Sequence, residues 1–497
     1  MSIGRHKIER NAIILVVTEV LAKALGLGLT MVVARMLGVE KFGLLAFAYA
    51  LSSICLVLPN FGLDRLTVRE LSRRPSRASQ FLVNISAVKG VLYLPMAGFC
   101  ALIVLLGPHA EGRLFVVLVV FMGAATQQHL LFGCSFFRAI QKMEREALVR
   151  LILAVLLLVT GLAVLMAGYG IKSLVASRVV VSLFCLGLVI LFIKKDLGVS
   201  LLKPSWRYAK RLVRMSAPLA IFYILVMFYG SLNIVILGFI KGDLATGYYS
   251  AAFKIIELFF YVPASVTGAA LPALSRSWKD SHQVFHQVYQ KCVRYLLLLE
   301  IPLAVGTFLL GERAIILLFG RDYLPSVAVI KVLALCLLPD FLNYIMSAAL
   351  ISMNRQKVAV IAALVGAVVA LVSCLIFIPL WGAVGAAASL AVSFSAVFFF
   401  QFCALFRQFR VLATFVTAAR AVVAGGLMGL GLVWFTAIGM PLPLLVGLSI
   451  IVYSGALLLF EEVKFHEVKL GYELLRDLGK SLIVSRVSHQ GVQDTYR

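Results

Sequence analysis

Charged side chains are scarce in this chain of 497 residues: they make up 14% of it, against 62% hydrophobic residues. The mean hydropathy is +1.02, and only short polar connectors interrupt the apolar sequence before residue 461. No soluble core could absorb so much apolar surface. A soluble globular protein is therefore excluded, and we expect the chain to lie in a membrane.

Motifs that would indicate catalysis or a cofactor are also missing. A phosphate-binding loop would need lysine after Gly247, where Tyr248 stands. His282 and His286 are four residues apart, but Gln283 replaces the glutamate that a zinc peptidase requires. The eight cysteines form no CxxC pair and are interpreted as packing residues. We therefore expect no enzyme, no metal, no cofactor and no ATPase within the chain.

Fourteen apolar stretches, each about long enough to cross a bilayer, follow one another along the sequence. A span needs about 20 mostly apolar residues, and its backbone must be hydrogen-bonded internally, which favours helices. The sequence therefore predicts an all-α polytopic membrane protein with about fourteen transmembrane helices. The predicted spans are residues 11–33, 44–62, 82–107, 114–137, 149–168, 173–193, 216–240, 248–274, 293–311, 326–353, 358–378, 383–406, 420–439 and 444–460.

The net charge of +24 indicates topology in such a chain and not a nucleic-acid partner. When the first two residues of each span are counted with the adjoining loop, 34 of the 46 Lys and Arg residues fall on the side of the amino terminus, and 7 fall on the opposite side. Cytoplasmic loops carry the excess of Lys and Arg, so both termini are expected to be cytoplasmic. A basic inner face also attracts anionic membrane lipids.

Two hairpins that are six spans apart share a pattern of glycines. Gly38 and Gly43 bracket the turn of the first hairpin, and Gly238 and Gly247 bracket the turn between spans seven and eight. An even offset preserves orientation, so the halves are predicted to be parallel repeats with a substrate site between them. The predicted divisions are an N-terminal lobe (1–193), a basic linker (194–215), a C-terminal lobe (216–406), two further spans (407–460) and a cytoplasmic tail (461–497).

Ionisable side chains inside the predicted spans are the strongest evidence in the sequence for a functional site. Nine such charges facing lipid at roughly 2.5–3.5 kcal/mol each would oppose insertion by about 20–30 kcal/mol. Most of them should therefore face a hydrated cavity or one another. Apart from charges in the first two residues of a span, they are Glu19, Lys23, Lys89, Arg178, Lys254, Glu257, Glu300, Lys331 and Asp340.

The spacing of these residues supports a cavity between the lobes. Lys254, Glu257 and Tyr261 are three and four residues apart, which places them on one face of the eighth span. Glu19 and Lys23 are four residues apart on the first span and can form an ion pair. Both ion pairs also have an alternative interpretation, as structural pairs that never meet a substrate.

Other charges have competing explanations of their own. Arg178 and Lys331 lie close to the outer ends of their spans, and Lys89 lies near the inner end, so each could snorkel to the interface. Glu300 and Asp340 lie deeper, each close to a proline. They are interpreted as a hinge or as a site of ion coupling.

Three segments resemble the polysaccharide transporter family, the Wzx-type oligosaccharide flippases. They are VVARMLGVEKFGLLAFA (32–48), LGFIKGDLATGYYSAAFKIIELFFYVPASVTGAALPALSR (237–276) and LLFGRDYLPSVAVIKVLAL (317–335). The family belongs to the multidrug/oligosaccharidyl-lipid/polysaccharide flippase superfamily, and the resemblance extends over essentially the whole chain. It implies two six-helix lobes that rock against each other, with two additional C-terminal helices.

The resemblance also implies a cargo and a site. The cargo would be a polyprenyl-pyrophosphate-linked oligosaccharide, moved across a bacterial cytoplasmic membrane to build O-antigen, exopolysaccharide or capsule. Many relatives carry an acidic residue where Asn233 stands, so its absence changes the expected ion coupling. Together with the charged positions above, the predicted substrate cavity comprises Glu19, Lys23, Asn60, Lys89, Arg178, Asn233, Lys254, Glu257 and Tyr261, with Glu300 and Asp340 as possible ion-coupling residues.

Two other functions stay open at this point. An ion-coupled exporter of small amphiphiles is disfavoured by two spans beyond the usual twelve and by a positively biased cavity. A membrane glycosyltransferase or polymerase would need large outer loops, which the sequence does not provide. The expected partners are the lipid-linked oligosaccharide, membrane lipids and a polysaccharide polymerase or chain-length machinery, with the protein itself a monomer.

Overall fold

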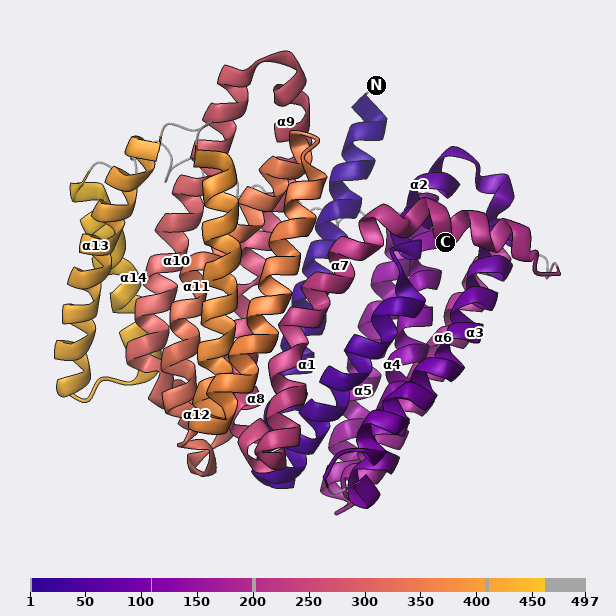
Figure 1. Cartoon of the computed structure of the whole chain (residues 1–497), viewed down its shortest axis with the longest axis horizontal. Helices are drawn as coiled ribbons and strands as arrows, with labels where there is room; N and C mark the ends of the chain where they lie inside the picture. Colours follow the sequence, from indigo (N-terminus) through magenta and orange to yellow (C-terminus); the bar gives the residue numbers. More distant parts are fainter. Residues whose placement is uncertain (1, 109, 199–202, 407–410, 461–497) are drawn as a thin grey trace, which may run out of the picture.

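The computed structural model describes residues 2–108, 110–198, 203–406 and 411–460, and this part of the chain is helical apart from short turns (Figure 1). The helices are α1 (Ser2–Asn60), α2 (Leu63–Arg73), η1 (Pro75–Arg77), α3 (Ala78–Leu105), α4 (Ala110–Ala139), α5 (Met143–Met166), α6 (Ile171–Leu197), α7 (Trp206–Ile240), α8 (Gly242–Phe259), α9 (Tyr261–Asp280), α10 (His282–Phe319), η2 (Arg321–Tyr323), α11 (Ser326–Ser352), α12 (Gln356–Phe406), α13 (Val411–Ala437) and α14 (Leu442–Leu459).

Two of the helical stretches each contain two membrane passes. The chain reverses within α1 at Gly38, whose φ is 78°, and within α12 at Gly382, whose φ is 56°. Glycine tolerates this left-handed region because it has no Cβ. With α8 and α9 forming one pass, eleven long apolar helices and the shorter apolar segment Ile224–Ile240 account for fourteen passes. The predicted all-α polytopic fold is confirmed.

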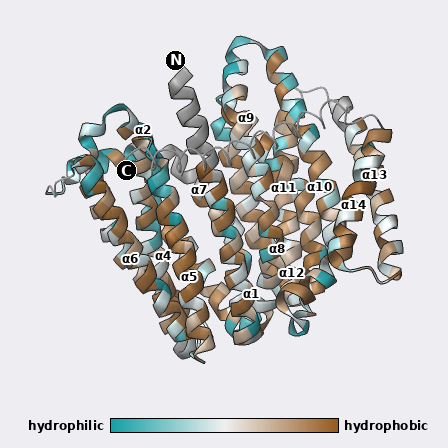
Figure 2. Ribbon diagram, turned by 180° about the vertical axis from the view of Figure 1, so that it is seen from behind, coloured by the Kyte–Doolittle hydropathy of each residue, from teal (hydrophilic) through white to brown (hydrophobic). Residues whose placement is uncertain are grey.

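The surface of the helices has the polarity that a bilayer requires. Figure 2 shows a hydrophobic band across the middle of the helices, with hydrophilic residues concentrated at the edges, notably around α2 and the α9–α10 turn. Large apolar side chains point outward within the band; Leu94 is 78% exposed and Leu430 is 71% exposed. In water these side chains would be unfavourable, whereas lipid tails solvate them.

Helices from the two halves of the chain form two bundles (Figure 1). One contains α1 and α3 to α6, with α2 lying across its end; the other contains α7 to α12. Helices α13 and α14 pack outside the second bundle, against α10, through their own apolar cluster. The two bundles lean away from each other toward the edge that carries the amino terminus. We call them the N-lobe and the C-lobe.

The predicted basic linker is helical in its second half, since α7 begins at Trp206 and continues into the seventh pass. The backbone N–H of Ser205 donates to Oδ1 of Asn84 at 2.7 Å and so fixes the start of α7 to α3. Ala209 and Leu212 are buried on the same side, in the apolar cluster of the N-lobe. The first turns of α7 are therefore docked on the N-lobe, although the rest of the helix belongs to the C-lobe.

Candidate functional site

Lys23 is the residue at which two predicted site helices meet. From α1 in the N-lobe, its ammonium donates to the hydroxyl of Tyr261 on α9 of the C-lobe and lies 4.3 Å from the centre of that ring. The same ammonium lies 3.8 Å from Oε1 of Glu19, and the two side chains are 42% and 45% exposed. The predicted Glu19–Lys23 pair is therefore present, and it lies at a contact between the lobes.

Glu19 has a second cationic partner that sequence reasoning missed. Arg150 on α5 donates from Nη1 to Oε2 of Glu19 at 2.5 Å, and from Nη2 to Oε1 of Glu146 at 2.8 Å. Arg138 on α4 approaches the other oxygen of Glu146 at 3.1 Å. Arg150 is the second residue of its predicted span, so it was counted with the loop. The four-residue spacing of Glu146 and Arg150 was the signal that could have identified it.

The C-lobe contributes a second exposed ion pair. Nζ of Lys254 lies 2.7 Å from Oε2 of Glu257, and the side chains are 41% and 36% exposed. The continuous helix face predicted through Tyr261 is interrupted, because α8 ends at Phe259 and α9 begins at Tyr261. Charged side chains with this exposure are costly in contact with lipid, so they require a hydrated surface.

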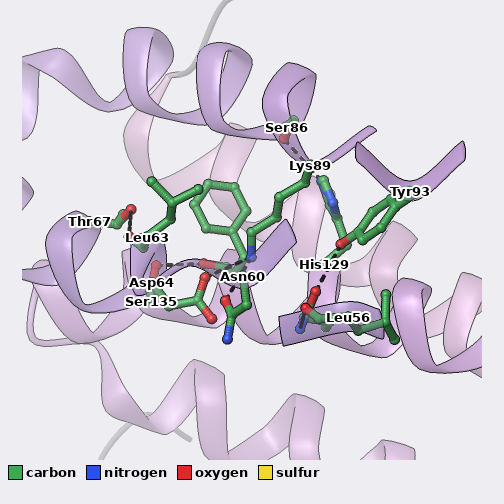
Figure 3. A network of polar contacts seen from close by, with 12 residues as sticks. Leu56, Asn60, Leu63, Asp64, Thr67, Ser86, Lys89, Tyr93, His129 and Ser135 are labelled. Carbon is green, nitrogen blue, oxygen red and sulfur yellow. Dashed lines mark hydrogen bonds and ion pairs between the residues drawn. The ribbon is translucent and has the colours of Figure 1, made fainter. Parts of the chain in front are cut away.

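Lys89 lies inside the N-lobe and not at the lobe interface (Figure 3). Its side chain is fully buried, with Nζ 2.8 Å from Oδ1 of Asp64 and 3.4 Å from Oδ1 of Asn60. The ammonium also lies 4.7 Å from the centre of the Phe132 ring. The structure thus places two of the predicted cavity residues, Lys89 and Asn60, in a network that joins the end of α1 and the start of α2 to α3.

Polar side chains of α4 extend this network (Figure 3). Nε2 of His129 lies 3.0 Å from the hydroxyl of Ser86 on α3. Gln128 donates to the carbonyl oxygen of Leu56 at 3.0 Å, and the hydroxyl of Tyr93 donates to Oε1 of Gln128 at 3.5 Å. These contacts are helix–helix hydrogen bonds within one lobe.

Two further predicted cavity residues lie in separate places. The guanidinium of Arg178 on α6 stacks over the ring of Tyr49 at 5.2 Å, beside a small pocket that Gln127 also lines. Asn233 on α7 is buried, where its amide donates to the hydroxyl of Tyr249 at 3.1 Å and to the carbonyl oxygen of Ala386 at 3.5 Å. Asn233 therefore ties three helices of the C-lobe together.

Glu300 on α10 and Asp340 on α11 are buried carboxyl groups of two neighbouring helices. They are 1% and 7% exposed, and each has one oxygen without a hydrogen-bond partner. Among the described residues, neither carboxyl group has an ion-pair partner within 4.0 Å. Pro302 and Pro339 lie inside the same helices and remove backbone donors close to both groups.

The two lobes are joined at the edge opposite the amino terminus by a buried ion pair. Arg113 on α4 donates from Nε to Oδ2 of Asp243 on α8 at 3.1 Å, and its Nη2 lies 2.9 Å from Oδ1. The guanidinium also stacks over Phe47 at 5.2 Å. Two contacts between one guanidinium and one carboxylate fix orientation as well as distance.

Main-chain atoms complete this contact. Arg35 on α1 donates to the carbonyl oxygens of Leu317 and Leu318, and the hydroxyl of Tyr323 donates to the carbonyl oxygen of Ala34 at 2.9 Å. The two glycine hairpins themselves touch; a Cβ on Gly43 would lie 1.8 Å from the carbonyl oxygen of Asp243. We call this set the hairpin seal: Arg35, Gly43, Arg113, Asp243, Gly247 and Tyr323.

Two helical lobes that are sealed at one edge and carry partly exposed ion pairs on α1 and α8 have the architecture of a membrane transporter. The chain belongs to the family described as polysaccharide biosynthesis protein, whose model matches residues 32–328. The model of the lipid II flippase MurJ matches residues 232–454. The family predicted from the three segments is confirmed.

Curated relatives come from Haloferax volcanii. The probable low-salt glycan biosynthesis flippase Agl15 is 22% identical over 473 residues, covering 92% of this chain and 97% of the relative. The probable flippase AglR is 25% identical over 319 residues, covering 61% of this chain and 62% of the relative. These relatives are named as flippases and not as enzymes.

Solved structures share the fold. Lipid II flippase MurJ in an inward closed conformation superposes with a TM-score of 0.72 at 14% identity, covering 91% of this chain and 98% of that one. An inward-facing multidrug transporter of the MATE family gives 0.67, covering 80% and 98%. An outward-facing MATE structure gives 0.51, covering 82% and 95%.

Proposed function

We propose that this protein is a flippase that moves lipid-linked oligosaccharides across a membrane for the synthesis of a surface polysaccharide. The observation that carries the proposal is the match of residues 32–328 to the polysaccharide biosynthesis family. The full-length similarity to a probable glycan flippase supports it, as does the two-lobe fold. The exposed ion pairs between the lobes give the headgroup a polar route, while the lipid tail stays in the bilayer.

The charges suggest which group of the substrate they meet. A polyprenyl pyrophosphate headgroup is anionic, and Lys23 and Lys254 offer partly exposed ammonium groups. The edge with the hairpin seal carries few Lys and Arg residues in the predicted topology, so it is the proposed outer edge. Both termini are then cytoplasmic. With the outer edge closed, the substrate would enter from the inner leaflet. We place the protein in a bacterial cytoplasmic membrane as a monomer, working with a polysaccharide polymerase.

Depletion of the protein in its own cells tests this function directly. Lipid-linked repeat units should accumulate in the inner leaflet, and surface polysaccharide should fall, because the units cannot reach the outer leaflet. Extracted lipid-linked sugars and surface polysaccharide would be measured in parallel. Unchanged lipid-linked sugars together with new sensitivity to cationic drugs would instead support an exporter of small amphiphiles, which the MATE-like fold permits.

Replacing Lys23 or Lys254 by alanine should abolish polysaccharide export without loss of membrane insertion. Each change removes one partly exposed cation from the predicted cavity, where its attraction to phosphate is stronger than in bulk water. Export and the amount of protein in the membrane would be measured together. Lys279→Ala is the matched control, because Lys279 is exposed at the end of α9 and away from the lobe interface. Full export in both cavity variants would remove these lysines from the substrate path.

Glu300 and Asp340 are the proposed ion-coupling residues. Both carboxyl groups are buried without an ion-pair partner among the described residues, and an unpaired buried charge is costly, which makes them the candidates for carrying the coupled ion. Glu300→Gln and Asp340→Asn mimic the protonated state and should uncouple transport from a pH gradient imposed on proteoliposomes. Glu312→Gln is the control, because Glu312 lies on the same helix as Glu300 but is exposed. Transport by the two variants that still follows the gradient would exclude this role.

A further inference from the structure

Five charged side chains of the N-lobe form a continuous cluster, which we call the counter-ion cluster. It runs from Lys23 to Glu19 at 3.8 Å, to Arg150 at 2.5 Å, to Glu146 at 2.8 Å and to Arg138 at 3.1 Å. Three cations therefore share two carboxylates, and the cluster carries an excess positive charge. Helices α1, α4 and α5 contribute to it.

The two carboxylates of this cluster differ sharply in burial. The side chain of Glu146 is 2% exposed and is held by Arg138 and Arg150, whereas the side chain of Glu19 is 45% exposed. Breaking the contacts of a buried carboxylate leaves an uncompensated charge in a low dielectric. An exposed ion pair is weak by comparison, because water competes for both partners. Glu146 is therefore held in place by its two arginines, whereas the carboxylate of Glu19 can move away from its cations.

The geometry around Glu19 fits a phosphate group equally well. Lys23 approaches Oε1 of Glu19, and Arg150 binds Oε2, so two cations hold the two oxygens of one carboxylate. Guanidinium groups recognise carboxylate and phosphate oxygens with the same fork of donors. If Glu19 turned away, the same two cations could bind two oxygens of one phosphate. That position is next to Tyr261, the contact of Lys23 in the other lobe.

We propose that Lys23 and Arg150 form a phosphate-binding subsite and that Glu19 is its exchangeable counter-ion. The inference rests on the proposed function and adds Arg150 and Glu19 to it. The pyrophosphate of the incoming substrate displaces the Glu19 carboxylate, and Arg150 remains in place through its other contact, to Glu146. When the lobes move, the return of Glu19 to the two cations helps to release the headgroup. Glu19 thereby limits affinity and permits turnover.

Binding of a sugar-free polyprenyl pyrophosphate to the purified protein in detergent tests this subsite. Glu19→Gln removes the competing anion, so the dissociation constant should fall roughly tenfold, while flipping in proteoliposomes slows. Arg150→Gln removes a phosphate ligand and should weaken binding roughly tenfold, with Arg150→Lys in between. Arg145→Gln is the matched control on the same helix and should bind like the wild type, because Arg145 pairs with Asp196 outside the cluster.

The outcomes separate this inference from the proposed function. Weaker or unchanged binding by Glu19→Gln would overturn the role of Glu19, and unchanged binding by both Arg150 variants would overturn that of Arg150. Arg150→Lys keeps the charge, so it tests the role even where Arg150→Gln fails to fold. If the wild type binds and no variant differs from it, only the subsite is wrong. If the wild type itself does not bind the pyrophosphate lipid, the proposed function fails.

Discussion

Replacing Asp64 by alanine is expected to lower the free energy of unfolding by about 3–5 kcal/mol, the usual cost of leaving one partner of a buried ion pair uncompensated. The ammonium of Lys89 is fully buried and has Asp64 as its ion-pair partner at 2.8 Å. Without that carboxylate, the partners of the charge among the described residues are Asn60 and the face of Phe132. Titration of the purified protein with a denaturing detergent would measure the loss.

Two further variants make this expectation specific. Asp64→Ala combined with Lys89→Met removes both charges and should recover most of the stability, since no uncompensated charge remains. Glu70→Ala on the same helix removes a carboxylate that pairs with Arg69 on the surface, and it should cost less than about 1 kcal/mol. The interpretation of Lys89 as a structural residue is wrong if Asp64→Ala unfolds as readily as Glu70→Ala.

Gly43→Ala is expected to abolish transport by opening the hairpin seal. The new methyl group would lie 1.8 Å from the carbonyl oxygen of Asp243 and 2.6 Å from the backbone nitrogen of Gly247. Neither is a flexible side chain, so the two hairpins must separate, and the closed state loses population relative to the open one. Gly26→Ala on the same helix is the control, because its Cβ would have no neighbour within 4 Å.

Thiol labelling can detect this separation. Val39 lies against Gly247 of the seal and is 9% exposed, so Val39→Cys should react slowly with a membrane-impermeant maleimide in the parent protein and faster once Gly43→Ala is added. Of the eight cysteines, Cys403 is exposed, and Cys403→Ser would lower the background labelling of native thiols. Equal labelling rates with and without Gly43→Ala, together with normal export, would show that the hairpins are not a seal.

The number of passes was predictable from the sequence because hydrophobicity and length decide it locally. The turns within α1 and α12 were also readable, since Gly38 and Gly382 mark the places where the backbone must adopt a positive φ. Helix α2 was missed because it is too short and too charged to span a membrane. Its signal was the spacing of Leu63 and Leu66, whose side chains are buried, whereas Arg65 and Arg69 of the same helix are exposed.

The site was only partly predictable, because ion pairs join residues that the sequence keeps far apart. Glu19 and Lys23 share a helix, and their pairing follows from a four-residue spacing. Arg113 and Asp243 are 130 positions apart, so their pairing needs the fold. The charge of Lys89 was visible in the sequence, but its burial depends on α2 folding over the end of the N-lobe.

The acceptors in the hairpin seal have an evolutionary consequence. Arg35 and Tyr323 donate to carbonyl oxygens of Leu317, Leu318 and Ala34, and every residue type supplies such an oxygen. Mutation at the accepting positions can change the side chain without removing the hydrogen bond. Lineages of this family can therefore drift far in sequence on the acceptor side of the closure, provided that the donors and the small glycines persist.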